Sequence, residues 1–133
     1  NNHFRSGNKK TSFLIWCFFN TGNESCSYPE EMNMNFVLLY ITTKNREQAR
    51  SIGCVLLESH LVACINIIDG MQSVYWWNNQ ICEDTEAILI AKTRETNTDA
   101  VISRVKELHT YSCPCIVSLP ILNGNPDYLK WLE

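Results

Sequence analysis

Residues 36–48 read "FVLLYITTKNREQ" and predict a strand that runs directly into a helix. The first eight of them are apolar, aromatic or β-branched, as expected of a buried strand. Asn45 and Gln48 then have the spacing of a helix-capping pair. Apolar residues recur at helical spacing over residues 46–60, which predicts an amphipathic helix whose inner face carries Ala49, Ile52, Gly53, Leu56 and His60.

The rest of the chain predicts three more strands and a second helix. Residues 63–77 form one long strand bent at Asp69-Gly70, and Asn78-Asn79 reverses the chain into a partner strand over residues 81–93. A helix over residues 97–109 and a strand over residues 115–121 complete the pattern. This β-α-β-β-α-β order is typical of the α+β ferredoxin-like fold, an antiparallel sheet with two helices on one face.

The strands are apolar on both faces. Leu38 and Tyr40 alternate with Leu39 and Ile41 in the first strand, and residues 87–91 repeat the pattern. A sheet with one wet face would alternate polar and apolar residues, so the face without helices must meet another surface. Because the sequence contains no third helical layer, we predict that another copy of the chain covers this face.

Composition narrows the class of protein. With 133 residues, 45% hydrophobic and 19% charged, the chain suits a globular fold. Its net charge of −3 and its scattered basic residues argue against binding to nucleic acid. Seven cysteines, an odd number without compact disulfide spacing, indicate a reducing compartment, and we expect a cytoplasmic protein.

We expect residues 1–31 to be an extension, disordered or non-native, and residues 32–133 to be the domain. A basic stretch precedes "FLIWCFF" (13–19), so the alternative is that residues 5–27 act as a signal peptide for the secretory route. Seven apolar residues are far short of the roughly 20 that a membrane span needs, so no transmembrane segment is expected.

Two segments, "LVACINIIDGMQSVYWWNNQICEDTEAILIAKT" (61–93) and "ELHTYSCPCIVSLPILNGNPDYLKWL" (107–132), resemble the CutA divalent-cation tolerance family. The resemblance implies a ferredoxin-like subunit in a tight homotrimer similar to the PII signalling proteins. It also implies a role in tolerance of copper and other divalent cations and, for animal members, an association with acetylcholinesterase. No reaction is assigned to the family, and the sequence has no phosphate loop or nucleophile elbow, so we expect no enzyme.

Three residues are candidate ligands for Cu(I) or a divalent cation, namely Cys64, His109 and Cys113. The resemblance suggests Cys64, while imidazole and thiolate groups suit copper or zinc in general. The alternatives are buried structural cysteines and, for His109, a cap at the end of the second helix. Roughly 20 Å should separate Cys64 from His109 in one subunit, so a shared site would need two subunits.

The chain departs from the family pattern around these residues. Where the family has an acidic residue and a Pro-Glu step, this chain has Ser112 and Pro114-Cys115. Cys115 alternates with apolar residues along its strand, which predicts a position beneath the helices.

An aromatic and an acidic cluster lie on the long strand pair. We expect Tyr75, Trp76 and Trp77 to form a subunit interface or, alternatively, a ligand-stacking surface. The acidic cluster either holds a hard cation or is a solvated turn, and consists of Glu83, Asp84 and Glu86.

The sequence therefore predicts a non-catalytic homotrimer that binds copper or another divalent cation weakly in a metal-ion response. The alternative is an assembly or anchoring protein of the acetylcholinesterase-localisation type, with an acetylcholinesterase-associated partner and no metal role.

Overall fold

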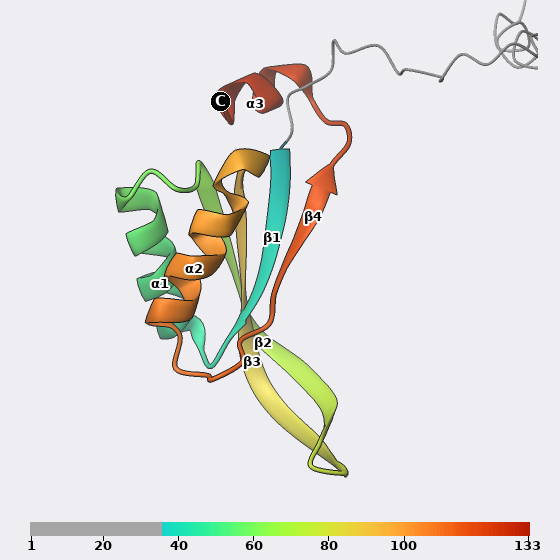
Figure 1. The fold of residues 1–133 in the computed structure, drawn as a ribbon. Helices are drawn as coiled ribbons and strands as arrows, with labels where there is room; N and C mark the ends of the chain where they lie inside the picture. Colours follow the sequence, from blue (N-terminus) through green and yellow to red (C-terminus); the bar gives the residue numbers. More distant parts are fainter. Residues whose placement is uncertain (1–35) are drawn as a thin grey trace, which may run out of the picture. The chain divides into compact units, whose positions relative to one another are not determined.

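The computed structural model describes residues 36–133, so the predictions for residues 1–31, and the start of the domain at residue 32, lie outside the described residues. The described elements are β1 (Phe36–Thr43), α1 (Arg46–Glu58), β2 (Cys64–Trp77), β3 (Gln80–Arg94), a 3-10 turn (Glu95–Asn97), α2 (Thr98–Leu108), β4 (Ile116–Ile121) and α3 (Pro126–Trp131). Figure 1 shows α1 and α2 together on one side of the sheet. The strand order is β2-β3-β1-β4 with antiparallel neighbours, which confirms the ferredoxin-like fold.

The core lies between the sheet and the two long helices. Strand β1 is central, because it pairs with β3 on one side and with β4 on the other. Alternate residues of β1 face the helices, and Leu39 and Ile41 are fully buried there. The helices contribute the complementary stripe, which includes Ile52, Leu56 and Val101.

Helix α1 begins as predicted but ends two residues early. The Asn45 side chain accepts a hydrogen bond from the Gln48 amide at 2.9 Å, and it thereby caps the helix. The prediction that the helix reaches His60 is wrong, because His60 has φ 53° and is exposed. The amides of His60 and Leu61 bond to the carbonyls of Leu57 and Leu56, which is a Schellman motif with histidine where glycine is usual.

Strands β2 and β3 form a long hairpin that extends past the other strands (Figure 1). The predicted bend is a bulge between Ile68 and Met71, where Gly70 has φ 73°. Asn78 and Asn79 both have positive φ, as a two-residue type I′ turn requires. The bend and the turn were therefore both predicted correctly.

The position predicted for Cys115 is wrong. Cys115 is exposed, and the residues that alternate with it, Val117 and Leu119, are 46% and 52% exposed. These two pair with Tyr40 and Leu38, whose side chains point away from the helices, and directly paired residues share a face. The sequence shows that the side chains of β4 alternate between two faces of the sheet. The pairing of β4 with β1 decides which of these two sets of side chains faces the helices.

The sheet face opposite the helices is apolar, as predicted. We call this the open face; it carries side chains from all four strands, including Leu38, Tyr40, Ile68, Ile88, Ile90, Val117 and Leu119. Ile68, Val117 and Leu119 are each about half exposed in one chain. An apolar surface of this kind indicates a contact site.

Helix α1 packs closely on the sheet at Gly53. A Cβ atom there would lie 2.4 Å from Ile65 Cδ1 and 3.2 Å from Leu89 Cδ1. The close approach explains why a residue that weakens helices stands in the middle of α1.

We predict that Gly53→Val destabilises the domain by about 1–3 kcal/mol, because a Cβ atom and two methyl groups must enter a filled space. The matched control is Ser51→Val on the exposed side of α1, which changes helix propensity without this contact. Urea unfolding followed by circular dichroism measures both variants. Equal losses in the two would show that packing at residue 53 is loose.

Candidate functional site

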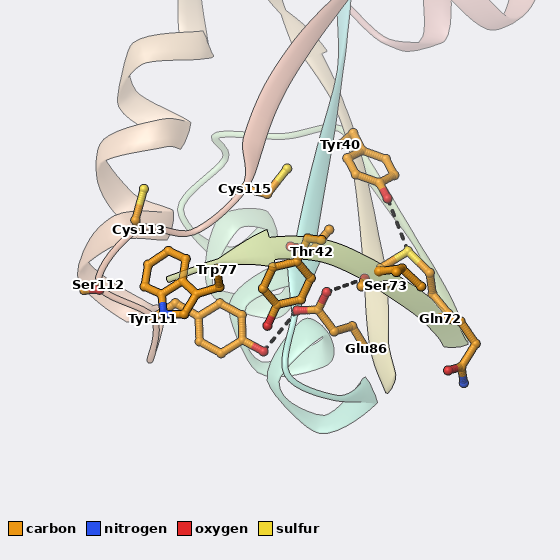
Figure 2. Close-up of a pocket in the computed structure, with 13 residues that line it drawn as sticks. Tyr40, Thr42, Gln72, Ser73, Trp77, Glu86, Tyr111, Ser112, Cys113 and Cys115 are labelled. Carbon is orange, nitrogen blue, oxygen red and sulfur yellow. Dashed lines mark hydrogen bonds between the residues drawn. The ribbon is translucent and has the colours of Figure 1, made fainter. Parts of the chain in front are cut away.

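A cavity of about 730 Å³ opens on the open face, at the base of the hairpin. Residues from β1, β2, β3 and the segment between α2 and β4 line it, and Figure 2 shows them. The lining residues are Tyr40, Thr42, Met71, Gln72, Ser73, Val74, Tyr75, Trp77, Glu86, Tyr111, Ser112, Cys113 and Cys115. None of these is Lys, Arg or His.

Glu86 is the one acidic residue among them, and it is 8% exposed. Ser73 donates a hydrogen bond to Oε2 at 2.5 Å, and Tyr111 donates one to Oε1 at 3.0 Å. Figure 2 shows the two hydroxyl groups reaching the carboxylate from different sides. The hydroxyls stabilise the buried charge by hydrogen bonding, and no cationic side chain of residues 36–133 forms an ion pair with it.

Two tyrosines near this carboxylate are hard to ionise. Burial, followed by the hydrogen bond to Glu86 and the charges of Glu86 and Asp84, raises the pKa of Tyr111 to about 12. The hydrogen bond that Tyr75 donates to Asp84 is the main cause that raises the pKa of Tyr75 to about 12. Both phenols therefore lie in a negative electrostatic environment.

His109 lies at the end of α2 and is 9% exposed. Its Nε2 is 2.8 Å from the Thr42 carbonyl, and its Nδ1 accepts a hydrogen bond from the Tyr111 amide at 3.0 Å. Since a carbonyl accepts and an amide donates, the neutral ring with hydrogen on Nε2 satisfies both partners. The ring joins β1 to the segment that carries Tyr111, so both nitrogens are occupied within the subunit.

The other two predicted ligands lie in separate places. Cys113 is exposed beside the cavity, and Figure 2 shows that Cys113 and Cys115 do not point toward one another. Cys64 is partly exposed at the start of β2, where its Sγ lies 3.4 Å from the Tyr128 hydroxyl and 3.7 Å from Lys92 Nζ. Across residues 36–133, the structure brings together no group of three or more His, Cys, Asp or Glu side chains suited to hold a metal ion.

Sequence reasoning missed several participants, including Tyr40, Tyr111, Ser73 and Tyr128. Tyr128 lies on α3, a six-residue helix that starts at an Asn125 cap followed by Pro126, a start signal visible in the sequence. Ser73 lies on the same hairpin face as Glu86, and strand alternation from the Asn78-Asn79 turn could have placed them together.

The predicted aromatic and acidic clusters are each divided between two faces of the hairpin. Tyr75 and Trp77 line the cavity, whereas Trp76, which is 71% exposed, points to the opposite side. Likewise Glu83 is paired with Val74 on the side of Trp76, while Glu86 faces the cavity. We call the side formed by Val74, Trp76 and Ile81 the outer face of the hairpin; Val74 also borders the cavity.

The protein-family model described as "CutA1 divalent ion tolerance protein" matches residues 37–133. The chloroplastic protein CutA 1 of Oryza sativa subsp. japonica is 40% identical over 97 residues, which are 73% of this chain and 55% of that protein. The divalent-cation tolerance protein CutA of Thermus thermophilus is 43% identical over 96 residues, 72% of this chain and 93% of that protein. The matched region thus spans little more than half of the rice relative but nearly all of the bacterial one.

Solved structures agree with these matches. The crystal structure of CutA1 from Oryza sativa has a TM-score of 0.72 at 39% identity and covers 74% of this chain and 91% of that one. The CutA1 structure from Thermus thermophilus has a TM-score of 0.71 at 44% identity, and the match covers 75% of this chain and 96% of that one. Among the described helices, none combines the length and apolar character of a membrane-spanning segment.

We predict that Glu86→Gln lowers the pKa of Tyr111 from about 12 toward its ordinary value of 10.0. The loss of the carboxylate charge makes the phenolate easier to form, while burial keeps the pKa somewhat elevated. Ultraviolet absorbance of tyrosinate measures the titration, with Tyr111→Phe to assign the signal. Glu83→Gln, on the outer face, is the matched control and should leave this titration unchanged.

The same shift links stability to pH. The unfolded phenol ionises near 10.0 and the folded one near 12, so the stability contributed by Tyr111 is full below pH 10 and is lost as the pH rises through 12. Glu86→Gln should lower the pH at which this stability is lost from about 12 toward 10, because the pKa of Tyr111 in the folded protein falls.

Proposed function

Because the chain belongs to the CutA1 divalent ion tolerance family, we propose that it acts as a non-catalytic homotrimer that binds copper or another divalent cation in a metal-ion response. Cys64 carries the metal part of this proposal. It is a partly exposed thiol on the open face, where a neighbouring subunit would lie. Thiolates suit Cu(I), so Cys64 offers a soft ligand on the face where neighbouring subunits would meet.

The residues around Cys64 in one subunit do not form a complete metal site. The neighbours of Cys64 are a phenol and an ammonium group, and the ammonium of Lys92 disfavours a cation beside the thiol. A site at Cys64 would therefore need ligands from other subunits, and binding would be weak. His109 fits a positioning role better than a ligand role, because its two ring nitrogens are already hydrogen-bonded to Thr42 and to the Tyr111 amide.

The exposed apolar surfaces support the trimer. On the open face, Val117 and Leu119 are about half exposed, and on the outer face of the hairpin Val74 and Ile81 are 64% and 62% exposed. A second copy of the chain would bury both surfaces, since the hairpin reaches beyond its own sheet (Figure 1). Trp76, on the outer face, is the aromatic side chain best placed for subunit contact.

The same surfaces also favour the alternative, an assembly protein whose trimer contacts an acetylcholinesterase-associated partner without a metal role. A reducing compartment such as the cytoplasm remains our proposal for its location. Relatives carry other locations in their names, chloroplastic for the rice protein and periplasmic for the protein from Archaeoglobus fulgidus.

We predict that reduced protein binds Cu(I) and that Cys64→Ser weakens this binding by about tenfold or more, because a thiolate that would bind the ion directly is lost. Competition with a chromophoric Cu(I) chelator measures the affinity. Cys54→Ser, on α1, is the matched control and should behave like wild type. Unchanged binding in Cys64→Ser removes this site, and absence of binding in wild type supports the assembly role. A loss specific to Cys113→Ser would move the site to the cavity.

We also predict that light scattering finds an assembly of three times the 15.3 kDa of one chain. Trp76→Asp should lower this mass, because a charge would be buried in an apolar contact. Ser51→Asp introduces the same charge on the exposed side of α1, away from both apolar surfaces, and is the control. A stable monomeric wild-type protein at micromolar concentration would contradict the trimer.

A further inference from the structure

We propose that the cavity at the base of the hairpin binds an organic ammonium ion, a function separate from metal binding at Cys64. The cavity combines a buried carboxylate, Glu86, with four aromatic side chains, and Cys64 does not line it. Its volume of about 730 Å³ lies within the range of small-molecule sites.

The charge of the cavity is negative and is not neutralised within the described residues. Glu86 is 8% exposed, and its two oxygens accept hydrogen bonds from Ser73 and Tyr111 without any cationic partner from residues 36–133. A carboxylate oxygen has room for a further donor, so an entering cation need not displace either hydroxyl. The raised pKa values of Tyr75 and Tyr111 agree with a negative field at this place.

The walls of the cavity are aromatic. Tyr40, Tyr75, Trp77 and Tyr111 line it, and Met71 adds a polarisable thioether. Aromatic faces attract cations through their quadrupole, most strongly for tryptophan and most strongly where water is partly excluded. Carboxylate and aromatic rings in one cavity thus favour a cation that also has apolar surface.

A metal ion fits this cavity less well. Calcium takes six to eight oxygen ligands and magnesium demands near-octahedral geometry, whereas the cavity offers one carboxylate. A soft metal would need converging thiolates, and Figure 2 shows that Cys113 and Cys115 do not converge. An organic ammonium ion needs one countercharge and apolar contact, and the cavity supplies both.

The test is calorimetric titration of the full chain with benzylammonium and with benzyl alcohol, a neutral analogue of similar size. We expect saturable binding of benzylammonium that is about tenfold or more tighter than binding of the alcohol. Glu86→Gln should abolish the preference for the cation. Glu83→Gln removes the same charge from the outer face and should retain that preference.

The proposal also predicts the effect of the aromatic wall. Trp77→Leu should weaken benzylammonium binding severalfold, and since Trp77 is 59% exposed this variant should fold even if Glu86→Gln does not. Equal affinity for the cation and the alcohol would overturn the proposal, as would equal effects of Glu86→Gln and Glu83→Gln. It would also be overturned if the assembled protein showed no saturable binding, the result expected where a neighbouring subunit fills the cavity.

Discussion

The structure depends on a sheet that is apolar on both faces while its own helices cover one. Leu39 and Ile41 of β1 are fully buried under α1 and α2, whereas Val117 and Leu119 of β4 stand about half exposed on the open face. Burial of the face under the helices stabilises the fold, and the open face is available for contact with another molecule. The proposed assembly and the proposed ligand binding both concern the open face.

The cavity on the open face lies at the base of the long hairpin of β2 and β3. Where β3 leaves the core its helix-facing residues Ala87 and Leu89 are buried, and the acidic segment begins at Glu86, the adjacent residue on the open face. Beyond this point β2 and β3 pair with each other alone, so side chains alternate between the side of Glu86 and the outer face, although Gln72 and Val74 also border the cavity. The same alternation separates Tyr75 and Trp77, which line the cavity, from Trp76, which is 71% exposed on the outer face.

The His109 ring links the segment after α2 to the sheet. Its ring bonds to Thr42 on β1 and to the amide of Tyr111, and its ring centroid lies 4.8 Å from that of Tyr111. This arrangement holds the segment after α2 against the sheet, where the Tyr111 hydroxyl reaches Glu86. A residue that resembles a metal ligand in the sequence therefore positions the polar end of the cavity.

The sequence by itself determined the elements, their order and the ferredoxin-like fold, because periodicity, capping pairs and turn residues are local features. The Asn45 cap, the bend at Gly70 and the Asn78-Asn79 turn all belong to this class. The face taken by Cys115 and the burial of Glu86 were decided by tertiary structure. They depend on contacts between distant residues, such as Tyr111 with Glu86 across 25 positions and Tyr128 with Cys64 across 64. A local pattern fixes that a strand has two different faces, but strand pairing and packing choose which face is covered.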